Sequence, residues 1–420
     1  GGPSAAIKNK VILPLNDTFK KYSPNISKIL KDSAEVDRMI QTADGQYYVY
    51  PFLRGTTAKN NEMLYSDGFV IRKDLLDKVH MSAPSTPDEW YQVLSAFKNQ
   101  LHIKTPMTIK AGSDATMLSR ELAGGFDSWG DFYIDGGKIK NGLVESTRLD
   151  YLTAMRKWYA EGLLDNDYLV VDTKAQNSKM LNSTSAVTYA PGGSGLGTWN
   201  TQMKAADSSA ELISTVPITS KKGRNARFSK MNQLYDGSGA AITTSCKHVA
   251  AAAKLLDYLY GDKGHMLANF GIEGKSYTMK NNVPTYTGEI LQNSKYAVSA
   301  AQSIYMRGHL SGPLMQDTRE LEQVYSQPEQ QEALKLWTKT EMPSHILPVL
   351  DISSTDSDTV AKITQNIKDY SSEMEAKFIS GAQPLNAQTF AEYVKQIQSF
   401  GLDKAISIYQ KAYDSYMKKK

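Results

Sequence analysis

The chain has 420 residues, of which 41% are hydrophobic and 22% are charged, and its formal net charge is +4. This length is too great for one ordinary hydrophobic core and predicts two domains, each able to bury a sizeable interior. No apolar run reaches the roughly 18 residues of a membrane-spanning helix, and the basic residues are scattered, so the composition argues against a transmembrane protein and against a nucleic-acid-binding one.

The first half of the chain alternates between segments with strand composition and segments with helical periodicity. Strands are predicted for residues 45–54, 62–73, 105–113 and 179–190, a hairpin for 132–141, and helices for 74–82, 86–101, 114–126 and 148–164. The hairpin turns at residues 135–137, and the helix over 86–101 begins with a capping box at Thr86. Trp90 and Trp158 lie on apolar stripes at helical spacing, so we expect both in the core.

Four glycines stand within residues 192–197, after a predicted strand and before a helix-like segment. A Walker loop needs Lys-Ser or Lys-Thr after the last glycine, and Thr198-Trp199 stands there instead. The spacing also matches a dinucleotide fingerprint only loosely. We therefore predict a strand-to-helix turn with close backbone approach and amide groups at a helix N-terminus, which suits a neutral polar ligand with an apolar face, such as a sugar.

The remainder of the chain begins with another strand and then becomes mainly helical. A strand is predicted for residues 239–246 and an Ala-rich helix for 247–271, and further helices for 331–342, 359–380 and 387–419. Strands alternating with helices indicate an α/β protein with helix-covered sheets.

No catalytic or metal-binding motif stands in the sequence. The six histidines are dispersed without H-x-H or H-E-x-x-H spacing, and no G-x-S-x-G elbow is present. Cys246 is the only cysteine, which excludes a disulfide framework and a thiolate zinc site. We predict no catalytic residue, metal or cofactor. A pair of carboxylates stays open, because a glycoside hydrolase places its two acids by fold rather than by spacing.

Seven segments stand in order along the chain: VILPLND, DGQYYVYPF, GFVIRKDLLDKV, STPDEWYQVLSAFK, WYAEGLLDND, NFGIEGKSYTM and FISGAQPLNAQTFAEYVKQIQSFGLDK. Together they resemble the extracellular solute-binding proteins of ABC importers, in the lipoprotein group of Gram-positive bacteria that takes up oligosaccharides. The resemblance runs from the first residues to the last, and several motifs together are more specific than any one of them.

This resemblance implies two α/β lobes of the periplasmic-binding-protein type, joined by crossover strands, with a helical C-terminal region and a ligand between lobes that close by a hinge. Matching by order assigns residues 1–105 and 240–310 to the first lobe and residues 106–239 and 311–420 to the second, with crossovers near residues 104–110 and 234–243. The opening GGPSAAIK has no features of a signal peptide. We therefore expect the first lobe to lack its N-terminal strand-helix-strand segment, together with a signal peptide and a lipidated cysteine.

Sugar recognition needs rings that stack on pyranose faces and planar polar groups that bind vicinal hydroxyls. The candidates for ligand contact are Trp129, Trp199, Arg54, Tyr189, Gly193, Ser194, Tyr235, Asp236 and Tyr277, with Arg307 and Gln316 as further candidates. Each tryptophan has an alternative role in the core, Arg54 an alternative ion pair, and Tyr235 an alternative role bracing the hinge. Related proteins often carry a calcium loop just before the equivalent of MTIKAG, but this chain has NQLHIKTP there, which predicts no such site.

The expected function is therefore capture of an oligosaccharide by a monomeric, lipid-anchored protein on the extracellular face of the cell membrane, for delivery to the permease subunits of an ABC importer. Two alternatives stay open. One is a glycoside hydrolase or lyase that uses two acids of the cleft. The other is a binding protein for peptides or other small nutrients on the same scaffold.

Overall fold

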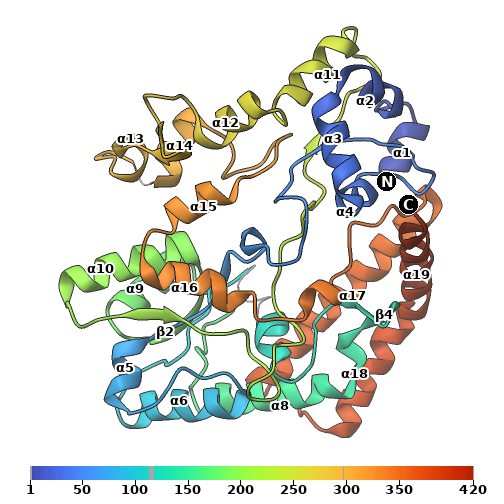
Figure 1. Ribbon diagram of the computed structural model, residues 1–420. Helices are drawn as coiled ribbons and strands as arrows, with labels where there is room; N and C mark the ends of the chain where they lie inside the picture. The colour runs from blue at the N-terminus through green and yellow to red at the C-terminus, as the bar shows by residue number, and fades with distance from the viewer. Residues whose placement is uncertain (1, 113–117, 297, 420) are drawn as a thin grey trace.

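The computed structural model describes residues 2–112, 118–296 and 298–419. They form an upper part and a lower part in the view of Figure 1, and further segments connect the two. No helix of these described residues is both long and apolar enough to cross a membrane.

The upper part contains α1 (Pro3–Lys8), α2 (Asn16–Tyr22), α3 (Pro24–Asp32), α4 (Ala34–Met39), α11 (Val249–Tyr258), α12 (Asp262–Phe270), α13 (Gly288–Leu291), α14 (Val298–Tyr305) and the hairpin of β8 (Tyr277–Lys280) and β9 (Val283–Tyr286). The connecting segments contain β1 (Tyr50–Pro51), the 3₁₀ turn η1 (Glu62–Leu64), β7 (Gly239–Ala240), α15 (Thr318–Val324) and the 3₁₀ turn η5 (Met342–Ser344).

The lower part begins with β2 (Asp67–Arg72), α5 (Lys73–Lys78), α6 (Pro87–Asn99), the π-helical turn η2 (Leu118–Leu122), the hairpin of β3 (Phe132–Asp135) and β4 (Lys138–Asn141), the 3₁₀ turn η3 (Gly142–Val144) and α8 (Ser146–Ala160). It continues with α9 (Thr173–Leu181), β5 (Val187–Pro191), the π-helical turn η4 (Gly192–Gly197), α10 (Thr198–Ala206), β6 (Leu212–Ser214), α16 (Pro328–Trp337), α17 (Ser354–Ser380) and α18 (Ala387–Ser399). The last helix, α19 (Leu402–Lys418), runs along the right side of Figure 1.

β2 is the central strand of a three-stranded antiparallel sheet, with β5 on one side and β6 on the other. Its side chains alternate between two hydrophobic clusters, since Phe69 packs with Trp90 and Val70 belongs to the cluster of Trp337. The indole approaches the sheet so closely that only glycine fits at position 68. A Cβ atom on Gly68 would lie 2.2 Å from Trp337 Nε1.

This strand pairing differs from the lobe boundary expected at residue 105. Because β2 pairs with both β5 and β6, residues 67–105 lie with the lower part. Residues 104–110, expected as a crossover, lie there as well, since Met107 forms bridges to Leu164 and Val187.

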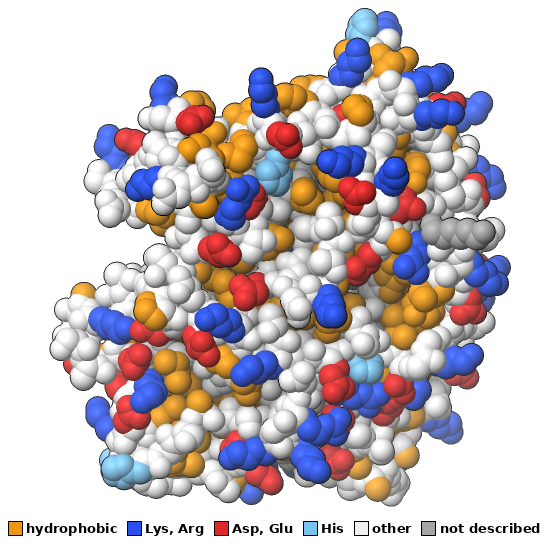
Figure 2. Space-filling view, in the orientation of Figure 1, with side chains coloured by type: hydrophobic (Ala, Val, Ile, Leu, Met, Phe, Trp, Pro, Cys, Tyr) orange, Lys and Arg blue, Asp and Glu red, His pale blue; other side chains and the backbone are white. Residues whose placement is uncertain are grey.

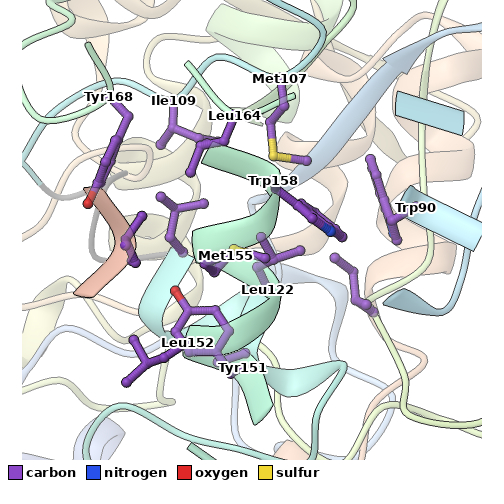
Figure 3. Packing of buried hydrophobic residues seen from close by; sticks show 14 of the residues in the cluster. Trp90, Met107, Ile109, Leu122, Tyr151, Leu152, Met155, Trp158, Leu164 and Tyr168 are labelled. Atoms are coloured by element: carbon purple, nitrogen blue, oxygen red, sulfur yellow. The ribbon is translucent and has the colours of Figure 1, made fainter. Parts of the chain in front are cut away.

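The core of the lower part is built around α8. Tyr151, Met155 and Trp158 lie on its buried face, and Figure 3 shows them among Leu164, Trp90 and their neighbours. Trp90 is 0% exposed and Trp158 is 2% exposed, which confirms the prediction that both lie in the core.

Local signals in the sequence are confirmed where they are strongest. The β3–β4 hairpin turns at its two glycines, whose φ angles of 55° and 79° favour glycine. At the start of α6, one half of the predicted capping box forms, since Thr86 Oγ1 accepts a hydrogen bond from Glu89 N at 3.4 Å. The Glu89 carboxylate accepts from Ser85 N at 2.8 Å in place of the Thr86 backbone N–H. Residues 113–117, where the predicted strand over 105–113 ends and the predicted helix over 114–126 begins, lie outside the described residues.

Two of the long predicted helices are each broken into two helices, and one predicted strand is shorter than expected. The helix predicted for residues 247–271 is two helices, α11 and α12, with Gly261 between them, and the helix predicted for residues 387–419 is α18 and α19. Gly401 causes the second break with a φ of 98°, which a helix cannot continue through. Of the strand predicted for residues 239–246, only the first two residues form β7.

Three segments run side by side where the chain passes between the two parts. Leu53 N donates to Leu314 O at 2.9 Å, and Gln316 N donates back to Leu53 O at 2.8 Å. On the other side, Arg54 N donates to Leu234 O at 3.0 Å, and β1 pairs with β7. We call these residues, 50–54, 234–240 and 314–316, the crossing segments. The second falls within the crossover expected near residues 234–243.

Arg148, at the start of α8, has a fully buried side chain. Its Nε and Nη2 donate to the two carboxylate oxygens of Glu375 on α17, at 2.8 and 2.6 Å, and its Nη1 donates to Ser119 O at 2.8 Å. The Tyr393 hydroxyl on α18 donates to the same carboxylate at 3.0 Å. The bidentate Arg148–Glu375 ion pair thus joins α8 to α17 inside the core, and the hydrogen bond from Tyr393 adds α18.

Replacing this arginine tests how much the pair contributes. Arg148→Met is expected to lower the free energy of unfolding by about 3–5 kcal/mol, because Glu375 would remain buried without its partner. Urea denaturation measures the loss. Lys73→Ala is the control, since it breaks an exposed pair with Asp77 and should leave the midpoint nearly unchanged. Equal midpoints in the two variants would contradict the assigned role of Arg148.

Candidate ligand-binding cavity between the two parts

A cavity of about 760 Å³ lies between the upper and lower parts. Its walls come from the crossing segments, from η4 and α10, from α13 and α14, and from α15 with the start of α16. In the space-filling view the outline is indented between the two parts (Figure 2). The polar residues of the lining are Arg54, Ser66, Ser194, Thr198, Thr201, Asn232, Ser299, Gln302, His309, Gln316, Glu320, Tyr325, Ser326, Gln327 and Gln330.

The predicted strand-to-helix turn is confirmed, because β5 leads through η4 directly into α10. Its glycines allow close approach: a Cβ atom on Gly192 would lie 2.9 Å from Tyr325 Cε2, and one on Gly197 would lie 2.2 Å from Gln330 Nε2. Gln330 Nε2 donates to Gly192 O at 2.9 Å, and Gln327 Nε2 donates to Gly197 O at 3.0 Å. The segment from Tyr325 to Gln330 therefore fixes the shape of the glycine turn.

The lining mixes polar side chains with apolar surface and carries little charge. Its carboxamide side chains are Asn232, Gln302, Gln316, Gln327 and Gln330. A planar amide carries donors and an acceptor side by side, which suits neighbouring hydroxyl groups. The amide groups of Gln302, Gln327 and Gln330 also donate within the protein. The rings of Phe52 and Tyr325 add apolar surface. Such a wall fits a ligand with many hydroxyl groups and an apolar face.

Arg54 is the only Arg or Lys among the described residues of the lining, and its charge is compensated within the protein. Its Nη1 donates to Asp236 Oδ2 at 2.9 Å and to Gln233 O at 3.2 Å, and the guanidinium lies 4.9 Å from the centre of the Phe52 ring. The alternative for Arg54, an ion pair with an acid, is thus present in the structure.

Two buried carboxyl groups differ in their surroundings. Burial raises the pKa of Glu320 to about 7, and its Oε1 accepts a hydrogen bond from Gln302 Nε2 at 2.5 Å. Burial also raises the pKa of Glu121 to about 7, and its oxygens accept from Lys230 N at 2.7 Å and from Ser229 Oγ at 3.2 Å. Glu320 lines the cavity, whereas Glu121 lies in η2 of the lower part.

The structure brings only some of the predicted site residues together at the cavity. Arg54, Gly193 and Ser194 line it, as does the further candidate Gln316, and Asp236 contacts Arg54. Arg307 is not among the lining residues.

The other predicted residues are aromatic and lie in the core: Trp129, Trp199, Tyr189, Tyr235 and Tyr277 are 1–6% exposed. Trp129 stacks on Phe228 with ring centroids 5.6 Å apart, and Trp199 Nε1 donates to Asn177 Oδ1 at 3.0 Å. The Trp199 ring therefore lies on the buried face of α10.

Three tyrosines are similarly enclosed. Tyr189 in β5 lies edge-on to Phe69 at 5.4 Å, and the Tyr235 hydroxyl accepts from the Tyr48 hydroxyl at 3.2 Å. Tyr277 in β8 packs against Phe270 at 6.0 Å. Ligand contact by any of the five buried rings stays a prediction.

Apart from Gln316, sequence reasoning missed the part of the lining between residues 298 and 330. Its contributors are Gln302, His309, Glu320, Tyr325, Gln327 and Gln330. The glutamine-rich SQPEQQ, with Pro328 at the first turn of α16, indicates a helix start and nothing more. From the sequence alone, a polar residue in such a segment is predicted to be solvent-exposed, because nothing local indicates which other part of the chain covers it.

Charged side chains of both signs are mixed on the visible surface (Figure 2). Within residues 2–112, 118–296 and 298–419, no group of three or more His, Cys, Asp or Glu side chains could hold a metal ion.

A family model and individual known proteins both match this chain, and they agree on the protein family. The family model described as bacterial extracellular solute-binding protein matches residues 2–266. The fructooligosaccharide ABC transporter substrate-binding protein FusA of Streptococcus pneumoniae is 23% identical over 444 residues, which cover 98% of this chain and 78% of that protein. Lipoprotein LipO of Bacillus subtilis is 24% identical over 229 residues, which cover 51% of this chain and 45% of that protein.

The fold is shared with solved structures. The crystal structure of the alginate-binding protein AlgQ2 without calcium ion has a TM-score of 0.77 and 24% identity, with coverage of 98% of this chain and 83% of that chain. The predicted binding-protein fold with a helical C-terminal region is thereby confirmed.

The clamp on the glycine turn can be tested with a matched pair of substitutions. Gly197→Ala is expected to lower the free energy of unfolding by about 1–3 kcal/mol, because the new methyl group displaces the Gln330 amide. Gly193→Ala is the control, since a Cβ atom there lies 3.4 Å from Tyr325 in ordinary contact. Urea denaturation compares the two, and an equal loss in both variants would argue against the clamp.

The raised pKa values of Glu121 and Glu320 predict a pH effect on stability. Between the ordinary carboxyl pKa of 4.5 and about 7, the folded protein holds protons that the unfolded chain has released, so these groups make the free energy of unfolding fall as the pH rises. Glu121→Gln should therefore gain stability relative to the parent between about pH 5 and pH 7, by at most about 1.4 kcal/mol per pH unit. Parallel stability curves for the two proteins would refute the assignment.

Proposed function

Because the chain belongs to the family of bacterial extracellular solute-binding proteins, we propose that it captures an oligosaccharide between its two parts and delivers it to the permease of an ABC importer. The observation that carries the proposal is the cavity, whose neutral carboxamides, hydroxyls and two rings come from both parts. The fructooligosaccharide specificity named for the pneumococcal relative supports a carbohydrate.

We propose ligand contacts for Arg54, Gly193, Ser194 and Gln316, on the support of their place in the lining. Closure would move the upper part against the lower part about the crossing segments, which run side by side between them.

The hydrolase alternative has less support from the cavity. Hydrolysis of a glycosidic bond commonly uses two carboxyl groups, and Glu320 is the only Asp or Glu among the described residues of the lining. A peptide ligand would need partners for its charged ends, and Arg54 already has one in Asp236. We therefore propose binding without chemical conversion.

We also propose that the protein acts as a monomer on the extracellular face of the membrane, held by a lipid anchor. The family's extracellular role supports the location, and the relative described as a lipoprotein supports the anchor.

A thermal-shift screen tests the function. Oligosaccharides are expected to raise the melting temperature, since a ligand at about 100 times its Kd adds roughly 2.7 kcal/mol, whereas amino acids and peptides should not. Mass spectrometry after incubation should recover the sugar intact. A cleaved sugar would establish the hydrolase alternative, and stabilisation by peptides alone would exclude a carbohydrate ligand.

A pair of tryptophan substitutions tests the location of the site. Ser194→Trp should weaken binding at least about tenfold by filling the cavity, a change of about 1.4 kcal/mol. Ser372→Trp, on the exposed side of α17 and outside the lining, is the control. Isothermal titration calorimetry measures both, and unchanged affinity in Ser194→Trp would place the sugar elsewhere.

A further inference from the structure

Residues 291–324 supply the side of the cavity that comes from α13, α14, α15 and the segment between them. Five aliphatic side chains of the lining belong to this stretch, and each is at least partly exposed: Leu291, Val298, Leu310, Leu321 and Val324. Leu291, Val298 and Val324 pack against the hydrophobic cluster of Phe270 and so continue it to the cavity. Leu310 is 48% exposed. We call these five side chains the aliphatic wall.

The polar side chains of the same stretch bond mainly within the protein. Gln302 Nε2 donates to Glu320 Oε1 at 2.5 Å, and Gln316 hydrogen-bonds to the same carboxyl group. The His309 ring forms a hydrogen bond with Ser303 Oγ at 3.0 Å. Because these polar groups already have partners, a ligand on this side of the cavity meets mainly aliphatic surface.

Hydroxyl groups lie on the other side of the cavity, which η4 and α10 of the lower part supply (Figure 1). Ser194, Thr198 and Thr201 are exposed there. Among the described lining residues between 291 and 324, Ser299 alone carries a hydroxyl group. The cavity therefore has an apolar side and a hydroxyl-rich side, and a ligand between the two parts would contact both.

The aromatic rings of the lining have little accessible surface, since Phe52 is 1% exposed and Tyr325 is 7% exposed. An oligosaccharide in this cavity would therefore place its apolar groups against branched aliphatic side chains and not against a flat ring. A flat ring matches the flat face of a pyranose. Branched side chains instead pack closely around a small protruding group, and dispersion attraction requires such close contact.

We propose that the aliphatic wall selects oligosaccharides that carry methyl groups, either in N-acetyl groups or as the C6 methyl group of 6-deoxy sugars. This inference rests on the proposed function and names the class of sugar. Burial of one methyl group against the wall tightens binding about fourfold. A hydroxyl group in the same place would lose its hydrogen bonds to water without gaining a partner. The hydroxyl groups of the preferred sugar face Ser194, Thr198 and Thr201.

Two matched pairs of sugars test the inference by isothermal titration calorimetry. Triacetylchitotriose and cellotriose share their linkage and differ in the acetamido group at C2 of each ring. 2′-Fucosyllactose and its analogue with L-galactose in place of fucose differ by one hydroxyl group at C6. The methyl-bearing member of at least one pair should bind at least about fourfold more tightly than its counterpart. The pair that shows the preference identifies the source of the methyl group.

Two variants assign the preference to the aliphatic wall. Leu310→Asn replaces an exposed apolar side chain by a polar one, and Val298→Thr exchanges a methyl group for a hydroxyl group in a side chain of the same shape. Each should at least halve the preference within the pair. This preference is a ratio of two affinities for one protein, so a loss of stability alone does not change it. Leu255→Asn is the control, because Leu255 is 68% exposed on α11 and lies outside the lining.

The outcomes distinguish the inference from the function beneath it. Equal affinities within both pairs, or a preference that both wall variants keep in full, would overturn the role of the aliphatic wall and leave oligosaccharide capture standing. The same conclusion would follow if the parent bound an unsubstituted gluco- or fructo-oligosaccharide but neither methyl-bearing sugar. Binding of peptides or amino acids with no response to any sugar would overturn both.

Discussion

The backbone hydrogen bonds among the crossing segments are the constraint on which the rest of the architecture depends. Residues 50–54, 234–240 and 314–316 are distant in sequence, yet they are paired with one another where the chain passes between the two parts. Backbone donors and acceptors that are paired in this way cannot separate without cost. These pairings attach the two parts to each other beside the cavity, whose walls come from both parts.

The cavity combines neutral polar groups with charges that are cancelled nearby. The carboxamides form hydrogen bonds but carry no net charge. The charges of Arg54 and Asp236 cancel because the two side chains form an ion pair. Neutral groups also hold the glycine turn, where the side-chain amides of Gln327 and Gln330 donate to backbone carbonyl oxygens. On the proposed function, selectivity for a polar ligand would come mainly from the geometry of these neutral groups.

The sequence predicted those features that short segments determine alone. The hairpin of β3 and β4, the start of α6 and the glycine turn follow from glycine conformation and capping, which act over a few residues. Apart from Gln316, the part of the cavity wall between residues 298 and 330 could not be predicted in this way, because its members become a wall only through contacts with the lower part. Trp129 and Trp199 show the converse: glycine-rich surroundings suggested a cleft, but neighbouring rings and helices cover both side chains.

The last helix, α19, contacts both parts of the molecule. Leu402 and Ala405 near its start pack in the lower core, whereas at its other end Tyr416 lies under Arg38 of α4, with the cation 5.8 Å from the ring centre. Figure 1 places α19 on the right side, away from α10, α13 and α14, which border the cavity on the left. Because α19 contacts both parts on this side, the closure proposed above would be largest on the opposite side, where α10, α13 and α14 border the cavity.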